Sequence, residues 1–149
     1  MSKIPRFAAY AAAFEKAFAS DDWSAVEPFF TEDAVYEVHL DPPMGGRFEG
    51  REAILAYFRR VLDGFDRRFD SREVAVVRGP SDRDGAVWVR GSATYRADGF
   101  PELRFELEET ATFEGDRIVR LEDRYDAADR GVLERYAADH GAKLGFDGS

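Results

Sequence analysis

From Ser71 onward the sequence alternates between apolar and polar residues, and this two-residue period constrains the fold more than any other feature. The alternating segments are REVAVVRG, GAVWVRGSATYRA, ELRFELEETATF and RIVRLEDRYD, with PSDRDG, DGFP and EGD between them. A β-strand turns successive side chains to opposite faces, and short connections rich in glycine, proline and aspartate favour hairpins. The second half of the chain is therefore predicted to form an antiparallel meander of long strands.

The first seventy residues follow helical spacing instead. A helix predicted over about residues 5–20 carries one aromatic stripe, which consists of Phe7, Tyr10, Phe14 and Phe18. The segment REAILAYFRRVLDGF repeats this spacing and predicts another amphipathic helix. A final helix is expected from about Asp129 to His140, with Gly141 as its C-terminal stop.

Shorter elements are expected between the first two long helices. Asp21 or Asp22 would cap a short helix in SDDWSAVEPFF, which should end near Phe30 because Pro28 removes an amide donor. The segment AVYEVHL alternates as a strand, and the proline and glycine residues of DPPMGGRFEG indicate a loop. Helices followed by a sheet predict an α+β domain, and a length of 149 residues with 44% hydrophobic content suits one domain over residues 1–149.

Charge and composition exclude several kinds of partner and site. The formal net charge of −9 argues against nucleic acid, whose binding surfaces are normally basic. The arginines of FRRVLDGFDRRFD are mixed with Asp63, Asp66 and Asp70, which indicates the solvated side of a helix and its exit. Cysteine is absent, which excludes disulfides and thiolate ligands. Glu15 and Lys16 interrupt the apolar N-terminal segment, so we expect a cytoplasmic protein with no membrane partner.

Two carboxyl groups fall in apolar registers of the last two predicted strands. Glu109 lies among the apolar positions of LRFELEETATF, and Asp123 lies between Leu121 and Tyr125 in RIVRLEDRYD. A buried carboxylate loses its water and must find a partner or bind a proton. On neighbouring strands the two groups could lie close enough to share a proton, which favours acid–base chemistry. The alternative is that each is paired with an inward arginine or tyrosine and has only a structural role.

The strand GAVWVRGSATYRA does not reveal which of its faces points inward. One face consists of Val87, Val89, Ala93 and Tyr95, and the other of Trp88, Arg90, Ser92 and Thr94. The apolar face suits a plain core. If the strand instead lines a cavity with its polar face, its wall consists of Trp88, Arg90 and Ser92, and Arg90 becomes a counter-charge for Glu109 or Asp123.

Glu37, His39 and Asp41 share one face of a predicted strand at a spacing compatible with metal ligands. We discount a metal site, because His140 is the only other histidine and this face is otherwise polar. No metal is therefore predicted. His39 remains a substrate-binding candidate and an alternative general base.

The order of these segments resembles the nuclear transport factor 2-like superfamily over essentially the full chain. The motifs that carry the resemblance are FTEDAVY, FEGREAI and DRIVRLEDRYD. It implies a cone-shaped α+β fold in which N-terminal helices pack on a curved antiparallel sheet. Members include SnoaL-like polyketide cyclases, ketosteroid isomerases, scytalone dehydratase, limonene-epoxide hydrolase and non-catalytic modules, so the fold does not decide the reaction.

A comparison of positions with two of these enzymes implies incomplete sites. The general-base aspartate and the tyrosine of ketosteroid isomerases match Val38 and Phe14, while their protonated aspartate falls near Glu109. In limonene-epoxide hydrolase the tyrosine matches Tyr36, the arginine Arg90 and one aspartate Asp123. Its other aspartate and its asparagine match Ser92 and Val38, so neither set is intact. The acid–base aspartate of SnoaL-like cyclases matches Asp123.

The resemblance therefore implies a small-molecule enzyme that performs cofactor-free acid–base chemistry on a hydrophobic, oxygenated substrate. The expected catalytic residues are Asp123 and Glu109, and the expected substrate-binding residues are Tyr36, Trp88, Arg90, Phe14, Val38 and His39. No cofactor is expected, and the expected partners are a hydrophobic small molecule and a second copy of the chain in a homodimer. The alternative is a non-catalytic ligand-binding or dimerisation module, which the apolar residues at positions 14 and 38 favour.

Overall fold

The structure is a computed structural model that describes residues 2–146, so both ends of the domain expected over residues 1–149 lie outside the described residues. Within this range the elements follow in the order α1 (Ile4–Ser20), η1 (Glu27–Phe29), β1 (Phe30–Val38), β2 (Gly46–Glu49), α2 (Arg51–Gly64), η2 (Asp66–Arg68), β3 (Ser71–Arg83), β4 (Ala86–Arg96), β5 (Leu103–Glu114), β6 (Arg117–Arg124) and α3 (Ala127–Leu144). No helix among the described residues is both long and apolar enough to cross a membrane. The predicted α+β class is confirmed.

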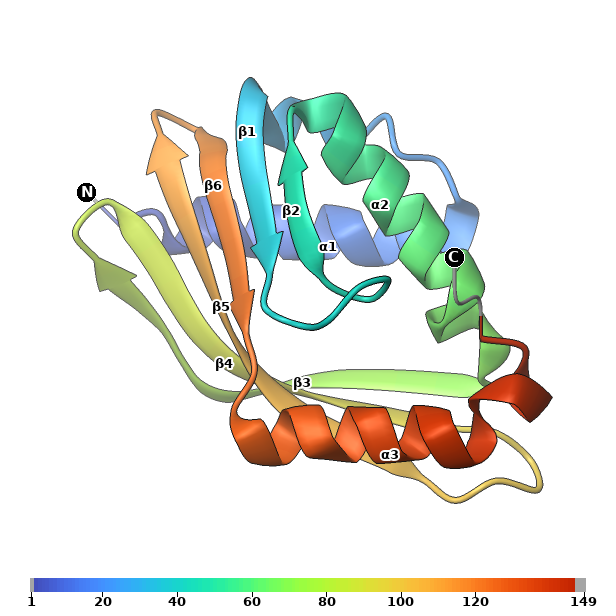
Figure 1. The fold of residues 1–149 in the computed structure, drawn as a ribbon. Helices are drawn as coiled ribbons and strands as arrows, with labels where there is room; N and C mark the ends of the chain where they lie inside the picture. Colours follow the sequence, from blue (N-terminus) through green and yellow to red (C-terminus); the bar gives the residue numbers. More distant parts are fainter. Residues whose placement is uncertain (1, 147–149) are drawn as a thin grey trace.

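The strands form one curved, open sheet in the order β2-β1-β6-β5-β4-β3. Figure 1 shows this sheet curling around α1 and α2 on one side, with α3 beneath the far ends of β4 and β5. The expectation of a purely antiparallel sheet was wrong at one position, because β1 pairs with β6 in parallel. Hairpin signals relate only strands that follow each other in sequence, whereas β1 and β6 meet across the whole meander.

The long helices follow the apolar periodicity, and the differences lie at their ends. α1 and α2 are confirmed close to the predicted bounds. α3 continues past Gly141, whose missing side chain leaves room for the Phe146 ring. The helix ends instead at Gly145, where φ is 77°, a left-handed conformation that favours glycine.

The short helix expected after Asp22 was wrong, since only the 3₁₀ turn of η1 forms there. Asp21 adopts the left-handed conformation and donates its amide to Ala17, so it ends α1 rather than starting a new helix. Two strand predictions also needed correction. β2 lies in a segment read as loop, and β3 runs through PSDRDG to a tight turn at Asp84 and Gly85, both with positive φ.

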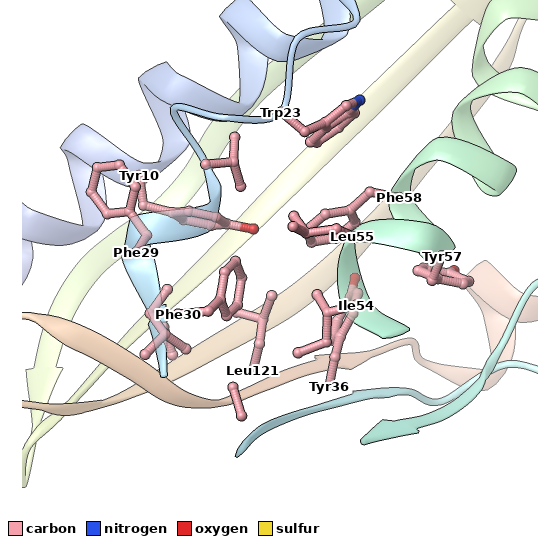
Figure 2. Close-up of a cluster of buried hydrophobic side chains, with 14 of the residues drawn as sticks. Tyr10, Trp23, Phe29, Phe30, Tyr36, Ile54, Leu55, Tyr57, Phe58 and Leu121 are labelled. Carbon is pink, nitrogen blue, oxygen red and sulfur yellow. The ribbon is translucent and has the colours of Figure 1, made fainter. Parts of the chain in front are cut away.

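Aromatic side chains fill the space between the helices and the sheet. Figure 2 shows side chains from α1, α2, β1 and β6 meeting in one cluster. Tyr10 packs edge-on against Phe30, and the Trp23 ring stacks on Phe58. A second cluster joins α3 to the far half of the sheet through residues that include Leu133, Tyr136, Tyr95 and Phe105. Between these two clusters the concave face of the sheet is left open to a cavity.

Candidate functional site

A cavity of about 370 Å³ lies between the concave face of the sheet and helices α1 and α2. Its walls are largely apolar, and they include Phe14 of α1, Phe58 of α2 and Val89 of β4. Polar groups enter it at two places, one around Glu109 and Asp123 and the other around Asp66. Such an apolar cavity with a few converging polar groups is typical of a small-molecule site.

Glu109 of β5 and Asp123 of β6 are directly opposite each other in the antiparallel register, and both line the cavity. Side chains in that relation lie about 5 Å apart at Cβ. Asp123 is 5% exposed. The Tyr36 hydroxyl on β1 donates a hydrogen bond to Oδ2 of Asp123. Oδ1 of Asp123 has no hydrogen-bond partner among the described residues, so it can accept a proton or a ligand's hydrogen bond.

The surroundings affect the pKa values of the two acids differently. Burial raises the pKa of Glu109 well above its ordinary value, and the neighbouring Asp123 raises it further. Burial also raises the pKa of Asp123, but contacts with Glu109 and Tyr36 oppose that rise. Two close carboxyls do not ionise together easily, and the contacts of Asp123 stabilise its charged form, so Glu109 is the member of the pair that holds a proton more strongly.

Two tyrosines beside the acid pair were not predicted as site residues. Tyr10 and Tyr125 both line the cavity. Burial raises the pKa of each hydroxyl well above its usual value, and the nearby carboxyl groups of Asp123 and Glu109 add to the rise, so both hydroxyls stay protonated and can donate hydrogen bonds. The signal was present in the sequence, because Tyr125 shares the face of Asp123 and Tyr10 shares the stripe of Phe14.

A second polar cluster lies in the same cavity, and sequence reasoning misjudged it. Asp66 was expected on a solvated helix side, yet it is 7% exposed. Its Oδ2 accepts hydrogen bonds from the Tyr95 hydroxyl at 2.7 Å and from Nε of Arg72 at 3.0 Å. Arg72 also pairs with Glu15 of α1 at 2.6 Å. Asp66 is buried because α2 ends just before it and the chain turns inward through η2. The cluster thus joins α1, η2, β3 and β4.

The side chains of Trp88 and Arg90, which were expected at the cavity, lie on the opposite face of β4. Val89 is the residue paired with Glu109, so its neighbours in sequence point away from the cavity. The Trp88 indole donates a hydrogen bond to Glu108 at 3.1 Å. Arg90 pairs with Glu106 at 2.7 Å and with Asp126 at 3.1 Å. Arg90 is therefore not a counter-charge for the acid pair.

Of the remaining predicted binding residues, some line the cavity and others do not. Phe14 lines the cavity, whereas Val38 is buried in the core beside it and does not line it. Tyr36 lines the cavity and contacts Asp123. His39 lies on the outer face, since it alternates with Val38 along the chain, and its Nε2 is 3.0 Å from Glu122. His39 does not line the cavity, so the prediction that it binds substrate there is wrong.

Among the described residues, His39 forms with Glu37 and Glu122 a group of side chains whose geometry could suit a metal ion. The ligand atoms of Glu37, His39 and Glu122 lie within 4.8 Å of one another. Arginines already neutralise both carboxylates, because Arg120 contacts Glu37 and Glu122 at 2.9 and 3.1 Å, and Arg47 and Arg124 add further pairs. The three residues are thus explained as part of an ion-pair network on the outer face of the sheet.

Comparison with known proteins agrees with this architecture. Residues 10–121 match a family model described as a SnoaL-like domain, which is 112 of the 149 residues. No curated protein sequence matches the chain.

Solved structures share the fold at low sequence identity. TerC, co-crystallised with polyporic acid, is 17% identical with a TM-score of 0.65, over 87% of this chain and 98% of TerC. A nuclear transport factor 2-like protein of unknown function from Burkholderia pseudomallei is 19% identical with a TM-score of 0.63, over 91% and 96% of the two chains. A candidate polyketide cyclase from Sinorhizobium meliloti is 23% identical with a TM-score of 0.56, over 77% and 93%. At these identities the likeness establishes the fold alone.

Proposed function

Because the chain belongs to the family of SnoaL-like domains, within the nuclear transport factor 2-like superfamily, we propose that it is a small-molecule enzyme that uses its own carboxyls for acid–base chemistry. The observation that carries the proposal is the opposed pair of Glu109 and Asp123 at an otherwise apolar cavity. A charged base and a neutral acid side by side are what proton transfer to and from a carbonyl compound requires. The substrate class is a hydrophobic molecule that contains a carbonyl or another oxygenated group.

The two carboxyls have different roles in this proposal. Ionised Asp123 takes a proton from a C–H next to a substrate carbonyl, and the electron pair of that bond moves to the carbonyl oxygen to give an enolate. The O–H of Glu109 donates a hydrogen bond to that oxygen as its negative charge develops. Return of the proton from Asp123 to another carbon of a conjugated enolate re-forms the carbonyl and completes an isomerisation. In a cyclisation the enolate carbon instead attacks a second carbonyl of the same molecule, whose π electrons move to its oxygen, and Asp123 returns the proton to that oxygen. In an elimination the enolate expels a leaving group, which takes the proton from Asp123.

Tyrosines take the supporting roles that the sequence assigned in part to Arg90. The Tyr36 hydroxyl holds Asp123 in place and keeps it ionised, so Tyr36 is a positioning residue. Tyr10 and Tyr125 line the cavity as neutral donors that can orient an oxygenated substrate. Phe14 and Phe58 supply apolar wall.

The proposal is tested by changing one oxygen of Asp123 to nitrogen. A thermal-shift screen of steroids, aromatic polyketide-like compounds, epoxides and terpenoids first identifies ligands, and NMR in D₂O then measures hydrogen exchange and turnover of each. Asp123→Asn is expected to keep the fold and ligand-induced melting shifts but to lose turnover by a factor of about 10² to 10⁴. Glu122→Gln, one residue away on the outer face, is the matched control and should keep full activity.

Two results would contradict the proposal. Turnover that persists in Asp123→Asn would show that the reaction does not require Asp123. Ligands that shift the melting temperature of the parent protein without any exchange or turnover would support the non-catalytic binding module instead.

A further inference from the structure

A second cavity, of about 330 Å³, lies outside the acid–base site, between the C-terminal part of α2, helix α3 and the loop that joins β1 to β2. In Figure 1 this loop projects over α3, and α2 ends beside it. Its walls are mainly apolar and include Pro43, Phe65, Leu133, Ala137 and Phe146. The proposed reaction uses none of these residues.

The two cavities abut each other. Both of them are lined by Leu40, Met44, Val61 and Phe65, so these residues form the partition between the acid–base cavity and the second one.

Met44 is the part of this partition that can move most easily. The backbone around it is held firmly, because the Tyr57 hydroxyl donates to the Met44 carbonyl, Arg60 donates to the Pro43 carbonyl at 3.1 Å, and the Gly45 amide donates to Asp41 at 3.1 Å. The Met44 side chain is partly buried, unbranched and has three rotatable bonds, which lets it adapt to different neighbours. Because Met44 lines both cavities, a change of its rotamer alters the boundary between them without moving this backbone.

The two cavities differ in chemistry in a way that orients a ligand. The first contains Glu109, Asp123 and their tyrosines, which bind oxygen atoms. Among the described residues, charged side chains enter the second lining from Asp41, Arg60 and Glu134, of which Asp41 and Glu134 are exposed. The rest of this lining is mainly apolar, so an uncharged apolar chain or ring suits it best.

We propose that the two cavities form one elongated site for an amphiphile, whose oxygenated head contacts Glu109 and Asp123 and whose apolar tail passes Met44 into the second cavity. This inference rests on the proposed function, because it takes the acid pair as the site of the head group. It predicts that the substrate is longer than the first cavity alone can hold.

A series of 4-alkylphenols, from 4-methylphenol to 4-nonylphenol, tests the inference by titration calorimetry. The phenol oxygen serves as the head group and the alkyl chain as the tail. Affinity should rise by up to about fourfold for each methylene group that enters the second cavity. The gain should stop once that cavity is filled.

A matched pair of variants on α3 separates the two cavities. Ala137 lines only the second cavity and is exposed, so Ala137→Trp fills that cavity without disturbing the core. This variant should lose the chain-length gain for 4-nonylphenol and bind 4-methylphenol within twofold of the parent. Ala138 is also exposed and lines neither cavity, so Ala138→Trp should bind every phenol as the parent does.

Glu109→Leu removes the proposed hydrogen-bond donor and shows whether head and tail belong to one bound molecule. It should weaken short and long phenols by the same factor. Affinity independent of chain length, an equal effect of Ala137→Trp on short and long phenols, or a 4-nonylphenol insensitive to Glu109→Leu would each overturn the inference while the acid–base proposal stands. Failure of every phenol to bind in a Glu109-dependent way would overturn the ligand role of the acid pair, and the inference with it.

Discussion

At the scale of single residues, the buried acid pair makes the free energy of unfolding depend on pH. A carboxyl that is buried and faces another carboxyl favours its neutral form, which the raised pKa of Glu109 expresses. The unfolded chain exposes the same group to water, where it ionises above a pH of about 4.3. Above that pH the native state binds more protons than the unfolded state, so the free energy of unfolding falls as pH rises toward the native pKa.

This linkage gives a prediction for Glu109→Gln. The amide cannot ionise, so the variant should not lose the stability that the parent loses as pH rises above about 4.3, the ordinary pKa of a glutamate. Between that pH and the raised pKa of Glu109, the stability of the parent relative to the variant should fall by up to about 1.4 kcal/mol per pH unit. Urea unfolding of both proteins at each pH measures it.

A constant difference between the two proteins across this pH range would contradict the raised pKa of Glu109. Glu108→Gln is the matched control, since Glu108 is the neighbouring residue and faces the other side of β5, where it bonds the Trp88 indole. This control keeps Glu109, so it should still lose stability as pH rises.

At the scale of elements, the position of α3 follows from unequal strand lengths. The pairing of β5 with β6 begins at Glu108, so the preceding part of β5 has no partner on that edge. Asp129 in the first turn of α3 accepts the Glu106 amide at 2.9 Å and lies 3.6 Å from Arg90. The helix thus satisfies a strand amide that the sheet leaves unpaired.

Asp129→Ala should therefore destabilise the protein by about 1–3 kcal/mol, because it leaves a partly buried amide without an acceptor. Asp126→Ala removes a more exposed partner of Arg90 and should cost no more than about 1 kcal/mol. Urea denaturation of both variants measures the difference. Equal losses would show that the Glu106 amide does not depend on Asp129.

At the scale of the whole molecule, the open sheet leaves β3 as an edge strand. The large hydrophobic side chains that remain exposed among the described residues are all on it, namely Val74, Val76 and Val77, at 50%, 62% and 47%. Val74 and Val76 also line the cavity, whereas Val77 does not. Exposed apolar edge strands favour association with another chain, so the homodimer expected from the sequence stays a prediction with β3 as its interface.

Sedimentation velocity should show a dimer of the parent chain, and Val77→Lys should shift it toward monomer. Ala138→Lys adds the same charge on α3 and is expected to leave the dimer intact. A monomeric parent would contradict the homodimer. A dimer that persists in Val77→Lys would show that the interface does not include this part of β3.

Local patterns in the sequence determined the elements and the exceptional residues. The two-residue period predicted β4, β5 and β6, and helical spacing predicted α1 and α2, because both periods arise from backbone geometry within a few residues. The same period showed that Glu109 and Asp123 each stand among apolar neighbours on the last two strands. These statements need no knowledge of what lies across the sheet.

Tertiary structure decided which faces turn inward and which distant residues meet. Alternation on β4 is equally consistent with either face in the cavity, and only the pairing of Val89 with Glu109 excluded Arg90. The contact of Tyr36 with Asp123 depends on a parallel pairing between strands far apart in sequence, and the burial of Asp66 depends on a turn at the end of α2. Periodicity records that residues share a face, whereas the partner of that face is chosen by packing and hydrogen bonding of the whole chain.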